Sequence, residues 1–234
     1  MKKLAIFVEG LTEQLFISKL FIELTGGKNI KIECQKARKT PRGNRSFQVI
    51  DATSTDTGQK YYVLIRDCGG ESTVKSDIVD SCADLTRSNY EKILGLRDVS
   101  PSFTHADIPK LERLLTYMVP TRFIPIRILL AVMECEAWFL AETTHYEKID
   151  SSITLDKVRD LLSFDPSCNN VEARMHPADD LNRIYHLAGK AYIKDRKRIS
   201  RTVEVLDYGL IYLDLRNRIP RLDELIREID VFLQ

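Results

Sequence analysis

A short apolar segment that stops at an acidic turn constrains the fold of this chain most. Residues 3–13 read KLAIFVEGLTE, so five consecutive apolar residues precede Glu9 and Gly10. A continuous apolar run of this length is typical of a strand that is covered on both faces, as in the sheet of an α/β protein. An amphipathic helix is expected to begin near Thr12 and to end at a pair of glycines.

Glu9 is therefore expected at the carboxyl end of a buried strand, where open α/β sheets place their ligands. Gly10 allows the chain to turn sharply at this point. Glu13 falls in the first turn of the following helix, where the helix dipole favours a carboxylate. A glutamate held beside a second acid in this way is suited to bind a metal ion or to act as a general base. An ordinary solvated loop acid is the alternative interpretation of Glu9.

Apolar segments that read as strands alternate with amphipathic segments that read as helices as far as residue 132. Further strands are expected at 30–35, 61–66, 93–96 and 123–132, with a short edge strand at 47–50. Helices are expected at 76–88 and 108–118. This order predicts an α/β protein with a mostly parallel sheet and helices on both of its faces.

The sequence changes character near residue 149, where helices and polar loops replace the strand segments. Helices are expected at 155–162, 177–187 and 222–233. We therefore predict two domains. Residues 1–148 form an α/β domain, and residues 149–234 form a mainly helical C-terminal region packed on it.

The charge balance limits the classes of partner. The 234 residues carry a formal net charge of +1, which argues against a protein that binds polyanions over its whole surface. Contact with nucleic acid would have to come from local basic segments. Two such segments stand out, a basic loop at 36–45 and a run in the C-terminal region; their cations are Lys36, Arg38, Lys39, Arg42, Lys194, Arg196, Lys197 and Arg198. Phosphate binding and a plain solvated basic surface are the two interpretations.

Two further features bear on the location of the protein. Its five cysteines are scattered without zinc-ligand spacing, which favours reduced thiols in a cytoplasmic protein. The longest apolar stretch, residues 123–141, is interrupted by charged side chains, so no membrane span is expected.

Acidic residues end several of the predicted strands. They are Glu9, Asp67, Asp98, Glu134 and Glu136. The carboxyl ends of parallel strands share one edge of a sheet, so these acids are expected to converge. Converging carboxylates repel one another unless a cation neutralises them, and oxygen ligands suit Mg²⁺ or Mn²⁺. Such ions support hydrolysis of a phosphodiester. A salt bridge to a neighbouring arginine is the alternative for each acid taken singly.

The same residues carry a family resemblance. Residues 8–13, VEGLTE, resemble the VEGxTE signature that opens the TOPRIM (topoisomerase–primase) domain of overcoming-lysogenisation-defect nucleases. The segments LRD at 96–98, IRI at 126–128 and ECEAWFL at 134–140 are similar to the LRDxD…VRI…ELEAWxL pattern of a TOPRIM-like family that is often encoded beside AAA-type ATPases. Residues 177–218 also look like the tail of that family, so the resemblance covers nearly the whole chain.

This resemblance implies a TOPRIM/Rossmann-like sheet with a helical extension and a centre that uses Mg²⁺ or Mn²⁺. Glu9 would be the general acid/base or a metal ligand, and Asp98 would open a DxD metal motif. The sequence departs from that motif because Ser100 replaces the second acid. A hydroxyl is a poorer Mg²⁺ ligand than a carboxylate. Asp67, Asp107, or the pair Glu134 and Glu136 are the candidates to replace it, and Glu13 is a further metal-ligand candidate.

The implied function is a TOPRIM-type nuclease that cuts DNA or RNA, as the effector of an ATPase-linked anti-phage defence or toxin-like system. The alternative is a catalytically impaired subunit that binds nucleic acid or a partner within an ATPase complex. Phosphotransfer on a nucleotide is a third reading. The implied partners are nucleic acid and an AAA-type ATPase; self-association is left open.

Overall fold

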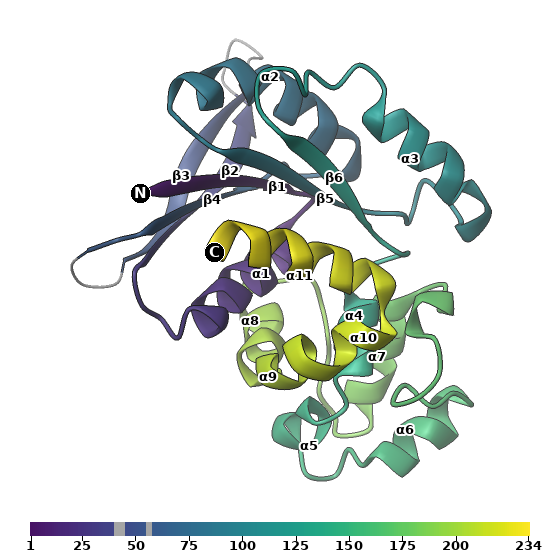
Figure 1. The fold of residues 1–234 in the computed structure, drawn as a ribbon. Helices are drawn as coiled ribbons and strands as arrows, with labels where there is room; N and C mark the ends of the chain where they lie inside the picture. Colours follow the sequence, from purple (N-terminus) through teal and green to yellow (C-terminus); the bar gives the residue numbers. More distant parts are fainter. Residues whose placement is uncertain (40–44, 55–57) are drawn as a thin grey trace. The chain divides into compact units, whose positions relative to one another are not determined.

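The sheet of this protein has six strands in the order β3-β2-β4-β1-β5-β6 (Figure 1). The structure is a computed structural model that describes residues 1–39, 45–54 and 58–234. The strands are β1 (Lys2–Val8), β2 (Ile30–Lys39), β3 (Arg45–Ser54), β4 (Tyr61–Asp67), β5 (Lys92–Asp98) and β6 (Ile126–Ala131). β1 pairs in parallel with β4 and β5, β2 pairs in parallel with β4, and β3 runs antiparallel to β2. The predicted α/β class with a mostly parallel sheet is therefore confirmed.

The chain forms two compact units. The sheet unit comprises residues 1–97, 109–130 and 229–234, and the helical unit comprises residues 98–108 and 131–228. The helical unit thus includes residues 131–148 as well as most of the stretch that follows. The predicted division at residue 148 stays a prediction.

In the sheet unit, β1 lies in the middle of the sheet and is buried on both faces. Its residues from Leu4 to Val8 are fully buried, as the apolar run predicts. Helix α1 (Leu11–Leu24) covers one face of the sheet and α2 (Val74–Arg87) covers the other (Figure 1). Helix α3 (Ile108–Thr116) buries Leu111 and Leu115.

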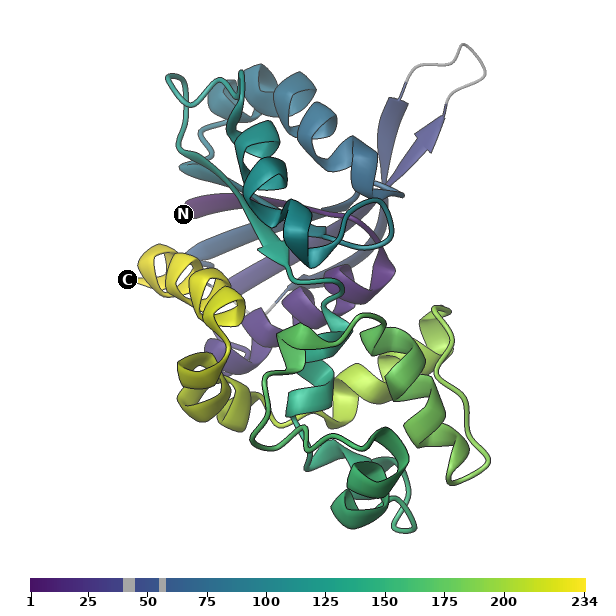
Figure 2. The same ribbon diagram turned by 90° about the vertical axis from the view of Figure 1, so that its right-hand side faces the viewer.

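The prediction of a basic loop at 36–45 is wrong for the residues at both ends of this segment, which are in strands. Lys36 to Lys39 belong to β2 and Arg45 begins β3, while Arg42 lies outside the described residues. The two strands pair as far as Lys39 and Arg45 and extend beyond the rest of the sheet (Figure 2). The antiparallel ladder gives each strand backbone partners, and this tertiary pairing outweighs the low strand propensity of lysine.

Short helices make up the helical unit. They are α4 (Glu136–Ala141), α5 (His145–Ile149), α6 (Leu155–Leu162), α7 (Pro177–His186), α8 (Arg196–Val205), α9 (Tyr208–Leu210), α10 (Arg216–Arg218) and α11 (Pro220–Leu233). The last residues of α11 belong to the sheet unit. The described chain also has a π-helical segment, η4 (Ile211–Leu215), and 3₁₀ turns at Glu71–Thr73, His105–Asp107 and Val171–Ala173. The predicted helices at 155–162, 177–187 and 222–233 are confirmed to within two residues at each end. In the described part of the chain, no helix is both long and apolar enough to span a membrane.

Candidate functional site

The exits of β1 and β4 meet at one edge of the sheet. Val8 pairs with Asp67, the last residue of β4, so Glu9 emerges directly beside the end of that strand. The turn after β4 folds back onto β1, because the Gly70 amide donates to the Glu9 carbonyl at 2.9 Å. Gly69 and Gly70 have φ angles of +68° and +149° in this turn, a conformation that L side chains rarely adopt. The turn therefore depends on both glycines.

Two carboxylates at this edge are buried. Asp67 is 1% exposed, and its Oδ1 accepts a hydrogen bond from the Gly69 amide at 2.8 Å. Glu13, 3% exposed, accepts from the Gly10 amide at 3.0 Å and closes the N-terminus of α1. With the half-buried Glu9 they form what we call the acidic edge (Glu9, Glu13 and Asp67). Each of the two buried carboxylates keeps at least one backbone donor, which offsets part of the cost of its burial.

Neighbouring polar side chains fix the acidic edge in place. Lys36 of β2 places its Nζ 3.5 Å from Asp67 Oδ2, and its side chain is 41% exposed. The Gln14 side chain is almost fully buried in the first turn of α1 and donates to the carbonyls of Gln35 and Ile65 at 2.9 and 3.0 Å. Gln14 thereby joins the start of α1 to the middle of β2 and to the last residues of β4 before Asp67. Side chains from two elements, β2 and α1, thus order the surroundings of the acidic edge.

The remaining predicted acids lie in the helical unit. Asp98 ends β5, and its Oδ1 accepts from the Cys135 amide at 3.2 Å. Glu136 begins α4, is fully buried and accepts from the Tyr192 hydroxyl at 3.0 Å. Glu134 accepts from the Ala178 amide, at the start of α7, at 2.8 Å. Backbone and side-chain donors therefore already occupy all three carboxylates.

Lys194 balances two of these acids. Its Nζ lies 3.2 Å from Glu134 Oε1 and 3.3 Å from Glu136 Oε1. Burial on its own lowers the pKa of Lys194, but Glu136 and then Glu134 outweigh it and raise that pKa overall. The Lys194 side chain is 47% exposed, so water screens part of this attraction. Lys194 was predicted as a nucleic-acid contact, and in the structure its charge is committed to these glutamates.

The other predicted cations lie on two elements. Lys36, Arg38 and Lys39 are in β2. Arg196, Lys197 and Arg198 form the first turn of α8, where the Asp195 side chain accepts from the Arg198 amide at 2.9 Å.

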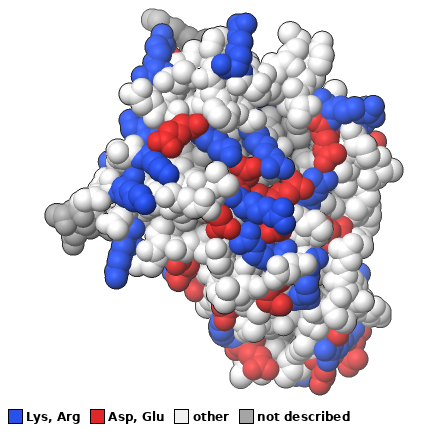
Figure 3. Space-filling model, in the orientation of Figure 1, with Lys and Arg blue, Asp and Glu red and all other residues white. Residues whose placement is uncertain are grey.

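A basic hollow of about 490 Å³ is lined by Lys197, Arg198 and Arg201 of α8. Arg201 is held by a 2.6 Å hydrogen bond from its Nη2 to the Ala191 carbonyl. On the face drawn in Figure 3, lysines and arginines are interspersed with aspartates and glutamates, as the near-zero net charge predicts. Lys197, Arg198 and Arg201 of the α8 hollow are suited to contact phosphate groups, although Arg198 also pairs with Asp195.

Sequence reasoning missed Gln14, which ties α1 to the carbonyls of Gln35 and Ile65, and Tyr192, which donates to Glu136. Gln14 sits in the conspicuous stretch at the start of α1, but nothing in its spacing shows that it would reach two strands. Tyr192 is 56 residues from Glu136, and a pairing over that distance leaves no periodic signal in the sequence.

No protein-family model, curated protein or solved structure matches the chain. The TOPRIM resemblance therefore continues to rest on the sequence segments quoted above.

Proposed function

We propose that this protein is a Mg²⁺- or Mn²⁺-dependent phosphodiesterase of TOPRIM type that hydrolyses DNA or RNA. The acidic edge is the observation that supports it best. Asp67 and Glu13 are carboxylates with 1% and 3% of their surface exposed. Asp67 ends β4 beside Glu9, which follows β1, and Glu13 lies in the first turn of α1. A buried or half-buried carboxylate at the end of a strand is a suitable ligand for a hard divalent cation, whose charge offsets the cost of keeping the carboxylate ionised there.

The residues of the acidic edge suit different roles. Asp67 is held by the Gly69 amide and suits a fixed metal ligand. Glu9 follows directly on a buried strand, is only half buried, and suits the acceptance of a proton from an attacking water. A bound divalent ion would supply polarisation of the phosphoryl oxygens.

The partners follow from the same proposal. Nucleic acid is the substrate, and the resemblance adds an AAA-type ATPase that regulates an effector in phage defence. A cytoplasmic location is part of this proposal.

Cleavage tests the proposal directly. Supercoiled plasmid and total tRNA are incubated with Mg²⁺ or Mn²⁺ and either wild-type protein or Glu9→Gln. We expect metal-dependent cutting that falls by about 10²-fold or more in Glu9→Gln, because a general base typically contributes this much. Glu23→Gln is the matched control, since Glu23 lies near the end of α1, outside the acidic edge, and its side chain is 44% exposed. Equal cutting by wild type and Glu9→Gln would disprove the proposed site.

A second function is favoured by the internal ion pairs. Lys36 pairs with Asp67, and Lys194 pairs with Glu134 and Glu136, so lysines already supply part of the positive charge that a metal would bring. Ser100, in place of the second motif acid, points the same way. These features suit a catalytically impaired subunit that binds nucleic acid or a partner. Mn²⁺ would then leave the melting temperature unchanged, whereas a working metal site gains stability by mass action.

A further inference from the structure

A pocket of about 320 Å³ opens on the face of the sheet that carries α2. It lies entirely within the sheet unit, and its volume is in the range of small-ligand sites. We call it the tyrosine pocket. The lining residues that bear on its chemistry are Lys3, Glu33, Gln35, Tyr62, Arg66 and Tyr90. None of them belongs to the acidic edge, so the pocket is a separate feature of the sheet.

The strand register explains why these side chains meet. Tyr62 of β4 pairs with Lys31 of β2 on one side and with Lys3 of β1 on the other. Side chains two residues apart on a strand point to the same face, so Arg66 extends the row that Tyr62 begins. On β2 the partly buried Lys31, Glu33 and Gln35 alternate with buried apolar residues that face α1.

The aromatic rings of the pocket present their faces to long cationic side chains. Lys31 Nζ lies 5.6 Å from the Tyr62 ring centroid, and Lys3 Nζ lies 5.7 Å from that of Tyr90. The two tyrosine rings are 6.1 Å apart and inclined at 70°. The Lys3 ammonium group is also held by a hydrogen bond to the Ser88 carbonyl at 2.9 Å. Lys31 has a flexible stem, so a flat ligand can replace it on the Tyr62 ring and keep it as a partner for its own negative charge.

The polar rim is ordered by a chain of hydrogen bonds. Gln35 Nε2 donates to Glu33 Oε1 at 2.7 Å, and Arg66 Nε donates to Gln35 Oε1 at 2.9 Å. Arg66 also lies over the Phe47 ring, with its Cζ 4.4 Å from the centroid. Burial, followed by the neighbouring Tyr90 and Glu33, raises the pKa of Tyr62, so its hydroxyl remains protonated near neutral pH. The rim thus offers fixed donors and acceptors around an aromatic floor.

We propose that the tyrosine pocket binds a nucleobase together with its phosphate. The Tyr62 ring would stack on the base, with the Tyr90 ring inclined to it, Glu33 and Gln35 would pair with the polar edge of the base, and Lys31 with Lys3 would meet the phosphate. An aliphatic ligand would leave the polar rim unpaired, and an inorganic anion without a base would leave the aromatic rings uncovered. The base can come from a free mononucleotide or from an unpaired position in a strand. The inference goes beyond the proposed phosphodiesterase and requires no metal.

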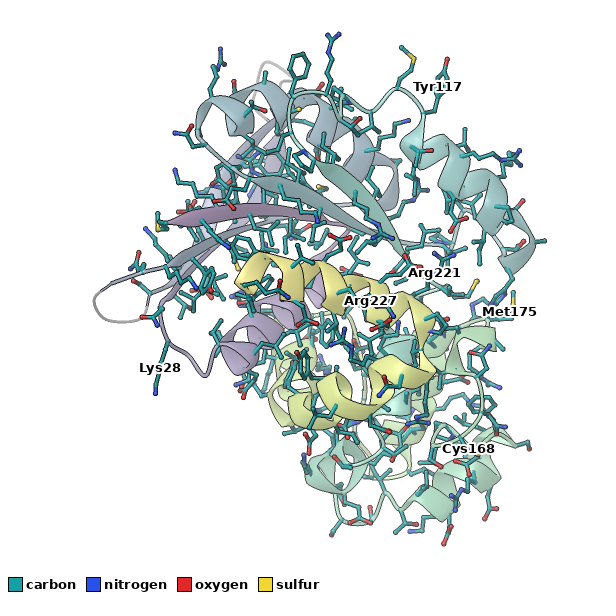
Figure 4. The ribbon with its side chains drawn as sticks, in the orientation of Figure 1. Lys28, Tyr117, Cys168, Met175, Arg221 and Arg227 are labelled. Carbon is teal, nitrogen blue, oxygen red and sulfur yellow. The ribbon has the colours of Figure 1, made fainter. Side chains whose placement is uncertain are left out.

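Isothermal titration in EDTA tests this inference with AMP, GMP, CMP, UMP and a single-stranded octanucleotide. We expect saturable binding of at least one probe, and a Kd that rises about tenfold in Tyr62→Leu, since one lost base–aromatic stack is worth this much. Tyr117→Leu is the matched control, because Tyr117 projects from the end of α3 with 67% exposure (Figure 4). Its Kd should equal that of wild type.

Two further variants keep the test decisive. Glu33→Gln preserves a side-chain acceptor but removes its charge, and it should change the order of the Kd values of the four nucleotides. If circular dichroism shows that Tyr62→Leu does not fold, the Kd values of Glu33→Gln test the inference in its place. Binding of mononucleotides would identify a free nucleotide as the ligand, and binding of the octanucleotide alone would identify an unpaired base. Glu9→Gln should bind like wild type, which separates this test from that of the phosphodiesterase.

Three results would overturn the inference. One is the lack of saturable binding by any of the probes. Another is binding that neither Tyr62→Leu nor Glu33→Gln alters. The third is a tyrosine-containing peptide that binds in a Tyr62-dependent manner while the nucleotides do not, because the pocket would then be a protein-docking site.

Discussion

Lys194 is the residue on which the charge balance of the helical unit depends. Its ammonium group pairs with the fully buried Glu136 and with Glu134. In Lys194→Met the apolar stem remains but Glu136 keeps only neutral donors such as the Tyr192 hydroxyl. We expect a loss of about 1–2 kcal/mol in the free energy of unfolding, less than for a fully buried pair because Lys194 is partly exposed. Urea denaturation measures it. The exposed Lys197→Met should change stability little, and equal losses in both variants would refute this role.

Glu142 gives the stability of the protein a pH dependence. Burial on its own raises the pKa of Glu142, but hydrogen bonds and charge from His145, with Thr144, outweigh it and lower that pKa below its ordinary value of 4.5. A carboxyl whose pKa is lower in the folded state contributes stability that is present above the unfolded pKa and lost as the pH falls through the folded one. Stability should therefore decline below about pH 4.5.

Glu142→Gln removes this titration while keeping a side-chain oxygen that can accept from Thr144. We expect the variant to be less stable than wild type at pH 7 and to lose less stability between pH 5 and pH 3, as measured by urea denaturation. An equal loss of unfolding free energy in both proteins between pH 5 and pH 3 would show that other carboxyl groups cause the loss of stability in acid.

At the scale of elements, Arg45 joins the β2–β3 hairpin to α2. Its Nε and Nη2 donate to the two oxygens of the buried Asp77 at 2.8 and 2.6 Å, and Nη2 also donates to the Cys68 carbonyl. Arg45→Met should cost about 2–3 kcal/mol in unfolding free energy, because it leaves a buried carboxylate without its bidentate partner. Arg38→Met, an exposed position on the adjacent strand, is the control. Hydrogen exchange should show faster opening of β3 in Arg45→Met alone, and unchanged protection would contradict the assigned link.

The elements show where sequence reasoning succeeds and where it stops. The apolar run of β1 can be predicted because burial on both faces leaves a continuous hydrophobic signal, and Glu9 is then placed by the end of the run. Parts of β2 and β3 can also be predicted, as strands at 30–35 and 47–50. The extension of β2 to Lys39 and the start of β3 at Arg45 could not be predicted, because these basic residues are strand residues only through pairing with each other. Likewise Lys194 reaches Glu134 across 60 residues, so that pair is a product of tertiary structure.

At the scale of the whole molecule, the proposed chemistry draws on features that each unit supplies by itself. The sheet unit carries the acidic edge and the tyrosine pocket, and the helical unit carries the basic hollow on α8. With a formal net charge of +1, attraction to a polyanion must come from such local groups. Binding of nucleic acid through the three cations of the hollow should weaken steeply with salt, but less than in proteins that contact 6–10 phosphates.

The central claim is that the acidic edge binds a divalent cation, and titration of Mn²⁺ into the metal-free protein tests it most directly. Asp67→Asn is the informative variant, because an amide oxygen can still accept from the Gly69 amide while the charge is lost. The account predicts saturable Mn²⁺ binding in wild type and in Asp80→Asn, an exposed position on α2, and at least tenfold weaker binding in Asp67→Asn. Mn²⁺ affinity that is the same in all three proteins, or absent from wild type, would contradict it.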